Sequence, residues 1–458
     1  MIINYKRILT KAMILMVAIF SGLSAWSQKD QSAAIKQSAD TLNAKIVNQS
    51  AAIKHTADTL NNKIENLKTD FDFLKKLKFS GYIQAQWQLA DTAGQLSPFS
   101  GGNFPKYSDN RFMVRRGRLK ATYEGKLSQF VLQIDATQNG VVLKDAYVNF
   151  KDPWLQMFML QAGVFDRPFG FEVHYSSSMR ETPERARITQ TLFPGERDLG
   201  AMLTIQPKSG SRFNFIRANL ALVNGNAISS EIDSKKDFIG QLGINKTTRN
   251  QKFRYAIGIS YYNGGVFQET KKVYNMATLA DGTKGFVIDS TASNKGEYAK
   301  REYYGADAQF SFDWFLGVTT LRGEYLWGSQ PGSSSSNVSP NGRTINNPGT
   351  MDTYNRKFNG AYVYFIQNLF QSRHEIVVKY DFLDPNTDVK GMDIKSGNKF
   401  GGADIAYTTW GLGYNVRLNP NLKLMANYEI VKNEKTALTA YKTDLKDNVF
   451  TLRLQFKF

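Results

Sequence analysis

Along most of the chain, apolar and polar residues alternate with a period of two. The last nine residues show it: Phe450, Leu452, Leu454, Phe456 and Phe458 are apolar, and the four residues between them are polar. Successive side chains of a β-strand point to opposite faces, so this pattern predicts strands with one apolar and one polar face. It predicts sixteen of them, at 79–90, 111–124, 128–137, 142–150, 155–165, 197–206, 212–223, 237–246, 252–263, 300–311, 315–328, 355–367, 372–383, 403–417, 421–433 and 446–458.

The links between these strands alternate in length. Short turns fall near Gly125, Asp152-Pro153, Pro207-Lys208, 247–249, Asp313, Asn368 and Asn419-Pro420, and longer links span 91–110, 166–196, 264–299, 329–354, 384–402 and 434–445, with two modest ones near 138–141 and 224–236. Short turns on one side and long loops on the other are typical of bacterial outer-membrane barrels. The sequence therefore predicts an all-β fold, a 16-stranded antiparallel transmembrane β-barrel over residues 79–458. A barrel of that size encloses water rather than side chains alone.

The N-terminal 27 residues have the pattern of a secretory signal peptide. A basic start precedes an apolar stretch from Ala12 to Leu23, and Ala25-Trp26-Ser27 offers a small-x-small cleavage site before Gln28. We expect the mature protein to begin near Gln28, outside the cytoplasm.

Residues 28–78 precede the barrel and contain an internal repeat. Residues 32–36 recur at 50–54, and residues 39–43 recur at 57–61. The 18-residue period equals five turns of an α-helix, and apolar or small residues follow one another at steps of three and four from Ile35 to Leu74, with a stutter after Ile46. This pattern predicts a short periplasmic α-helical coiled coil that joins several copies of the chain; the alternative is a solitary amphipathic helix.

Composition narrows the chemistry. The formal net charge of +18 points to anionic partners, such as lipid headgroups or anions that pass through the barrel, and the alternative is a basic but inert surface. An extracytoplasmic chain is not expected to bind nucleic acid. Cysteine is absent and the three histidines, His55, His174 and His374, stand far apart, so we expect no metal site and no cofactor.

One predicted strand carries a row of cations on one face. Arg116, Arg118 and Lys120 alternate with Gly117 and Leu119. Three cations facing lipid at mid-depth would cost several kcal/mol, so they belong in the water-filled lumen, at intervals of about 6.5–7 Å. Such a row could pass an anion from one cation to the next, because conduction needs sites that attract weakly enough to release. The alternative is an ordinary polar lumen wall.

The longest charged link is the second candidate site. The link from Asp166 to Glu196 carries Glu172, Glu181, Glu184 and Glu196 among basic residues. A loop folded into the barrel could use ion pairs between them to anchor itself, while the remaining cations narrow the lumen. The alternative is a surface loop of mixed charge. The basic candidates are Arg167, Arg180, Arg185, Arg187 and Arg197, the last at the start of the next strand.

Several motifs in this part of the chain resemble the phosphate-selective porins of the O and P type. They are 115–119 (Arg-Arg-Gly-Arg-Leu), 144–147 (Lys-Asp-Ala-Tyr), 163–172, the serines 176–178, Glu184-Arg185 and 194–200. The resemblance implies a trimeric 16-stranded barrel with a third loop folded into the pore and Arg and Lys residues that carry anions. The resemblance assigns Arg116 and Arg118 to the row of cations that passes anions along the lumen. It assigns Arg167, Arg185 and Arg197 to the loop motifs. The family often has Lys where this chain has Arg167.

The expected function is passive diffusion of anions, phosphate or polyphosphate among them, through an outer-membrane porin that is not an enzyme. Expected partners are inorganic phosphate or other small anions, outer-membrane lipid and further copies of the chain in a homotrimer. The alternative is a structural barrel whose coiled coil contacts the cell wall and holds the membrane at a distance from it. A hydrolase would need a nucleophile beside a histidine, and His174 next to the serine cluster is the nearest candidate.

Overall fold

The computed structural model describes residues 30–340 and 352–458; the expected signal peptide lies outside the described residues. The chain divides between Lys75 and Lys76 into two units. The first contains one long helix, α2 (Asp30–Lys76), and the stutter after Ile46 does not interrupt it. The predicted helix is thus confirmed, while its pairing with other helices stays a prediction. Among the described residues, no helix is long and apolar enough to cross a bilayer.

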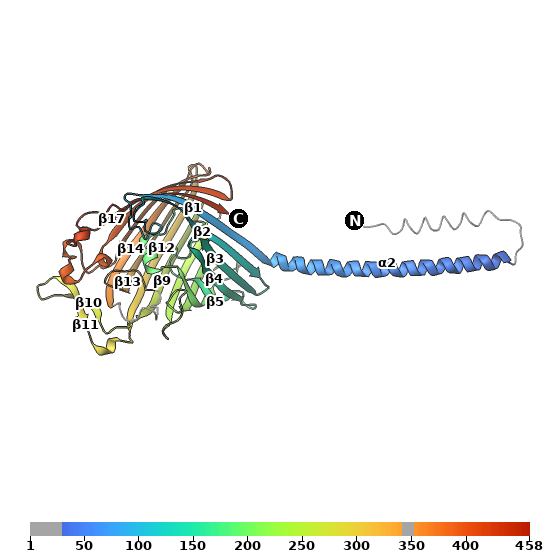
Figure 1. Cartoon of the computed structure of the whole chain (residues 1–458), viewed down its shortest axis with the longest axis horizontal. Helices are drawn as coiled ribbons and strands as arrows, with labels where there is room; N and C mark the ends of the chain where they lie inside the picture. Colours follow the sequence, from blue (N-terminus) through green and yellow to red (C-terminus); the bar gives the residue numbers. More distant parts are fainter. Residues whose placement is uncertain (1–29, 341–351) are drawn as a thin grey trace. The chain divides into compact units, whose positions relative to one another are not determined.

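The second unit is a closed antiparallel barrel of sixteen strands, as the alternation predicts (Figure 1). Its strands are β1 (Leu77–Ala90), β2 (Asn110–Glu124), β3 (Ser128–Thr137), β4 (Gly140–Lys151), β5 (Phe158–Asp166), β6 (Arg197–Ile205), β7 (Ile216–Val223), β8 (Asp237–Thr247), β9 (Phe253–Phe267), β12 (Tyr298–Trp314), β13 (Gly317–Gly332), β14 (Thr353–Asn368), β15 (His374–Asp384), β16 (Tyr407–Arg417), β17 (Leu422–Asn433) and β18 (Val449–Lys457). Each strand pairs with the next, β9 pairs directly with β12, and β1 closes the ring on β18.

One predicted long link contains strands of its own. Within 264–299, β10 (Val273–Thr278) and β11 (Lys284–Asp289) form a hairpin around Asp281-Gly282, a dipeptide that favours tight hairpin turns. Figure 1 shows this hairpin at one end of the barrel. It touches the barrel sheet through a two-residue parallel pairing with β14.

Burial in the barrel is the reverse of that in a soluble protein. On β18, Thr451, Arg453 and Gln455 are at most 4% exposed, whereas Leu452 and Phe456 are 37% and 47% exposed. Lipid satisfies the outer apolar face, and the polar face turns inward, so the polar positions of each strand are the ones that can build a site.

Loops at the long-link end pack on one another through a small apolar cluster. It joins the β10–β11 hairpin, the segment 385–406 and the start of β14, through Phe286, Tyr354, Val389, Ile394, Phe400 and Ile405. Short 3₁₀-helices lie in these loops, at Ala292–Asn294, Gly391–Asp393, Ser396–Asn398, Gly402–Asp404 and Thr439–Tyr441. Apolar contacts of this kind hold loops in one arrangement around the outer opening.

Candidate functional site

The segment between β5 and β6, residues 167–196, lies inside the barrel, and we call it the inner segment. Arg453 Nη1 donates a hydrogen bond to the Pro183 carbonyl over 2.7 Å, and Gln241 Nε2 donates one to the Gly170 carbonyl over 2.6 Å. These side chains belong to β18 and β8, which lie far apart around the closed sheet. Since the inner segment reaches both, it crosses the lumen.

Apolar side chains fix the inner segment against one side of the wall. Phe169 and Phe193 pack on Tyr262 and Tyr303, with ring centroids between 5.8 and 6.4 Å apart. The short helix α3 (Arg187–Leu192) belongs to the same cluster, which extends over β5 to β15. Gly305 makes room for it, because a Cβ there would lie 2.8 Å from the Phe169 ring. This core holds the inner segment against that side of the wall. Cavities remain along β2, β3 and β4 and also, with about 490 Å³, along β7, β8, β9 and β12.

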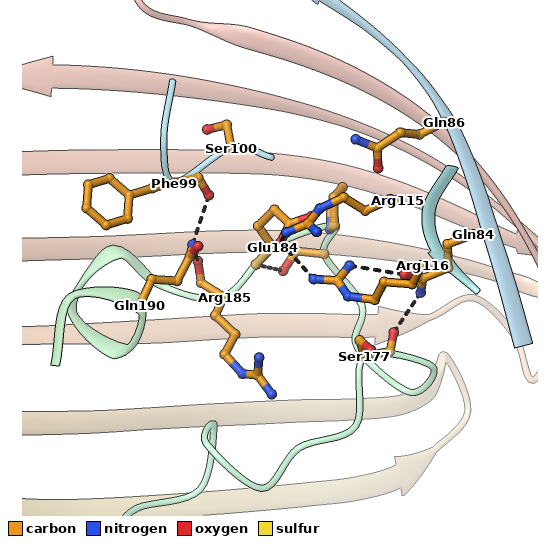
Figure 2. A network of polar contacts seen from close by, with 12 residues as sticks. Gln84, Gln86, Phe99, Ser100, Arg115, Arg116, Ser177, Glu184, Arg185 and Gln190 are labelled. Carbon is orange, nitrogen blue, oxygen red and sulfur yellow. Dashed lines mark hydrogen bonds and ion pairs between the residues drawn. The ribbon is translucent and has the colours of Figure 1, made fainter. Parts of the chain in front are cut away.

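Glu184 of the inner segment faces three arginines of the wall. Its carboxylate lies 2.9 Å from Arg115 Nε, 3.0 Å from Arg116 Nη2 and 2.8 Å from Arg453 Nη2. Figure 2 shows Arg115 and Arg116 turned toward Glu184 from the strands. Burial alone would raise the pKa of this carboxyl group, but the three cations and Arg180 outweigh it and hold the pKa well below its ordinary value. The carboxylate therefore stays charged and anchors the segment.

Arg115 enters this cluster through a β-bulge. Gln84 of β1 pairs with Arg116, but the next residue, Ala85, pairs with Val114, so Arg115 is the extra residue. A bulge lets two successive residues face the same side of a sheet. The alternation alone assigns Arg115 to the lipid face, and sequence reasoning missed it for that reason. Arg453 was visible as a cation on the polar face of the closing strand.

The other two cations of the row on β2, Arg118 and Lys120, differ in their partners. Arg118 is 7% exposed, and its Nε lies 3.2 Å from an Asp135 carboxylate oxygen on β3. Lys120 is partly exposed, and in the part of the chain that the structure describes no carboxylate lies within ion-pair distance of it. Along this row, Arg116 shares the carboxylate of Glu184 with two other arginines, Arg118 pairs with Asp135, and Lys120 has no ion-pair partner among the described residues.

A second carboxylate of the inner segment, Glu196, gathers further cations. It pairs with Arg185, with Arg197 at 3.0 Å and with Lys144 at 3.9 Å. Burial opposes its charge, but Arg185 and Arg197 outweigh burial and lower the pKa of Glu196 well below its ordinary value. Arg197 also pairs with Asp145 at 3.0 Å, so its charge is largely compensated.

The remaining three candidates have separate surroundings. Arg167 is 1% exposed, and its Nε lies 3.0 Å from a carboxylate oxygen of Asp198. Its charge is therefore paired inside the packed interior. Arg187 stacks between the rings of Phe99 and Tyr407, with its guanidinium carbon 4.6 and 4.0 Å from the two ring centroids.

Arg180 is the exception among the buried cations. It is 3% exposed, and within the described residues none of its three guanidinium nitrogens has a hydrogen-bond partner. Burial lowers its pKa well below the ordinary value, and the nearby cations Arg185 and Arg116 lower it further. A buried guanidinium without an acceptor is costly, and an anion beside it would relieve that cost.

Two of the cavities beside the inner segment are lined by most of the candidate cations. The outer one, about 700 Å³, is lined by Arg115, Arg116 and Arg187 together with residues of the long loops. The inner one, about 290 Å³, is lined by the cations Lys120, Arg197 and Lys457 and by the carboxylates of Asp145 and Asp166. Arg118 and Arg185 line both cavities. Arg167 and Arg180 line neither.

The surroundings of His174 do not form a catalytic dyad. His174 is half-buried, and among the described residues its Nε2 has no hydrogen-bond partner. Burial, and then the charges of Arg217 and other arginines, lowers its pKa to about 4. The serines 176–178 bond to one another, to Tyr82 and to wall glutamines instead. A serine–histidine hydrogen bond, which nucleophile activation requires, is not present among these described residues.

A closed sixteen-stranded barrel with an internal segment anchored by charges is the architecture of an outer-membrane porin. The chain belongs to the family of phosphate-selective porins O and P, whose sequence model matches residues 99–458, so the resemblance seen in the sequence is confirmed. The helix α2 and the strand β1 precede the matched residues. No curated protein sequence matches the chain.

Solved outer-membrane proteins resemble the whole barrel at low sequence identity. OmpT of Vibrio cholerae, in its trimer form, is 10% identical over 83% of this chain and 99% of its own, with a TM-score of 0.47. The outer membrane channel DcaP of Acinetobacter baumannii is 10% identical over 83% and 97% of the two chains, with a TM-score of 0.49. A porin refined at 1.8 Å is 13% identical over 83% and 100%, with a TM-score of 0.45.

Proposed function

We propose that this porin lets small anions, inorganic phosphate among them, diffuse passively across the outer membrane. The observation that carries the proposal is the pair Arg118 and Arg185, which line both cavities. A solute that moves from one cavity to the other passes two guanidinium groups, and guanidinium donates paired hydrogen bonds to phosphate and carboxylate oxygens. The inner segment narrows the lumen at this level.

Charge balance along the route supports a preference for anions. On the outer side, Arg115 and Arg116 share the single carboxylate of Glu184 with Arg453. On the inner side, Lys120 has no carboxylate partner in the described chain. Cations that outnumber carboxylates in a narrow, partly dehydrated passage create a positive potential that attracts anions. Passage of an anion through the two cavities needs no covalent chemistry.

The test is the reversal potential of the purified protein in a planar bilayer under a KCl gradient, repeated with phosphate added. We expect a reversal potential on the chloride side and a chloride current that phosphate reduces. The Arg118→Gln variant should shift the potential toward zero, and Lys78→Gln, a change on an exposed lysine that pairs with Glu124, should not. A reversal potential on the potassium side would overturn the proposal.

We further propose that α2 joins three copies of the chain through a periplasmic coiled coil. Its apolar residues, Ile35, Leu42, Ile46, Ile53, Leu60, Ile64, Leu67, Phe71 and Leu74, are between 43% and 65% exposed in a single chain. A stripe of this kind is stable in water when other helices cover it.

The alternative function, a barrel that tethers the membrane to the cell wall through α2, makes a different prediction. Deleting residues 31–74 should leave the conductance of each barrel unchanged if the protein is a pore. If it is a tether, envelope spacing should change in cells that carry the deletion, while reconstituted channels show only nonspecific conductance.

A further inference from the structure

The outer cavity has two chemically different walls. One wall carries the cations Arg115, Arg116, Arg118, Arg185 and Arg187, against which stand the carboxylates of Asp135, Glu196 and Asp447. The other wall comes from the long loops. It combines the apolar or aromatic residues Leu96, Pro98, Phe99, Val338, Tyr441 and Leu445 with the polar residues Ser97, Ser100, Ser335, Ser336 and Asn337. A passage for inorganic ions alone has no use for the second wall.

The apolar wall is not explained by lipid. Leu96 and Leu445 are 71% and 37% exposed, and both lie on loops beyond the strand ends. Apolar residues that face a cavity outside the bilayer cost free energy unless something covers them. A cavity of about 700 Å³ that combines an apolar lining with a few directed polar groups is the usual form of a small-molecule site.

Arg187 stands where the two walls meet. Its guanidinium lies between the rings of Phe99 and Tyr407, and its Nε is buried without a hydrogen-bond partner among the described residues. Stacking occupies the faces of a guanidinium and leaves its edge free to donate. A carboxylate oxygen at that edge would satisfy Nε, while a ring attached to the carboxylate would lie against the neighbouring apolar side chains.

We propose that the outer cavity binds aromatic carboxylates, that is, organic anions that join one carboxylate group to a flat apolar ring. The proposal deepens the proposed function, on which it rests: such anions are the preferred solutes of the cationic passage beneath the cavity. Inorganic phosphate meets the same arginines but gains nothing from the apolar wall. The ring does gain, because its transfer from water to an apolar surface is favourable.

The experiment compares benzoate with acetate as blockers of chloride current through the full-length channel in a planar bilayer, added from each side in turn. The two anions share a carboxylate and a charge of minus one and differ in the ring. We expect benzoate to halve the current at a concentration at least about tenfold below that of acetate, from one side only. Equal blocking concentrations would overturn the inference.

Two variants locate the effect in the cavity. Phe99→Ala removes a ring beside Arg187, and Leu445→Ser makes the apolar wall polar without touching the stacked arginine. Either should reduce the preference for benzoate at least about threefold. This preference is the acetate concentration that halves the current divided by the benzoate concentration that does so. Block by inorganic phosphate should stay unchanged. Tyr107→Ala is the control, since Tyr107 is 87% exposed on the same loop as Phe99 and does not line the cavity. An unchanged ratio in both cavity variants would overturn the inference.

The outcome is separable from that of the proposed function. A chloride-side reversal potential with equal block by benzoate and acetate would leave the anion channel in place and remove the aromatic site. A potassium-side reversal potential would remove the anion channel whatever the ratio.

Discussion

Replacing Glu184 by glutamine tests how the inner segment is held in the lumen. Glutamine keeps the size of the side chain and removes the charge that Arg115, Arg116 and Arg453 share. Glu184 is 3% exposed, so water cannot take over the role of the carboxylate. The variant therefore leaves three cations close together and uncompensated in a place of low polarity.

The expected size of the effect follows from that burial. Removing one partner of a buried ion pair costs about 3–5 kcal/mol, because the remaining charge stays buried. If that cost falls on the docked position of the inner segment, the undocked population rises about 100- to 3000-fold, at about 1.4 kcal/mol for each factor of ten. The barrel strands keep their own hydrogen bonds and should stay folded.

A thiol reporter can measure this population, because the chain contains no cysteine. Ser177 of the inner segment is 3% exposed and its hydroxyl contacts Tyr82 on β1. In a Ser177→Cys background, a water-soluble maleimide should label the thiol only when the segment leaves the wall, so the labelling rate follows the undocked population. Glu184→Gln should raise that rate by the factor given above.

The matched control is Glu231→Gln, the same chemical change on a surface loop. Glu231 pairs with Lys236 at 2.7 Å, but the two side chains are 33% and 43% exposed. Exposed pairs contribute about 0–1 kcal/mol, and this one lies outside the inner segment, so the labelling rate should stay within about twofold of the parent. A labelling rate in Glu184→Gln within about threefold of the parent would refute the idea that this cluster anchors the segment.

Three further predictions concern selectivity, pH and packing. Arg180→Gln should lower the chloride-to-potassium permeability ratio several-fold, because it removes a positive charge from the inner segment. It should not lower the stability of the barrel, because this buried cation has no hydrogen-bond acceptor in the described chain. A loss of stability would show instead that Arg180 has a structural role. Burial raises the pKa of Asp447 to about 6 against the opposing charge of Arg187, so below pH 6 the carboxyl group becomes neutral and the outer cavity gains one positive charge. The reversal potential should therefore move further to the chloride side between pH 7.5 and pH 5, and Asp447→Asn should abolish that shift; the same shift in the variant would assign it to another group. Gly305→Val should displace the Phe169 ring and destabilise the inner segment by about 1–3 kcal/mol, seen as faster labelling of Ser177→Cys, and an unchanged rate would mean that the apolar core does not hold the segment.

The alternation of apolar and polar residues is enough to predict the barrel. A period of two follows from the geometry of a single strand, so each strand can be predicted from its own residues. The closing strand at Phe450–Phe458 is therefore predicted as well as the strands in the middle of the barrel. The helix before the barrel is local in the same sense, because its seam depends only on steps of three and four residues. The cations Arg116, Arg118 and Lys120 could be placed on one strand face for the same reason.

Which cations share a site depends on contacts between distant parts of the chain. The bulge opposite Gln84 turns Arg115 inward. Neither residue carries a local sequence signal that predicts this bulge. Glu184 and Arg453 meet across 269 positions of sequence, and nothing local distinguishes Arg167, which is buried in packing, from Arg185, which lines both cavities. Register and the path of the inner segment arise from contacts between distant parts of the chain, whereas alternation arises within each strand, and that is why the sequence predicts the wall more fully than what the wall encloses.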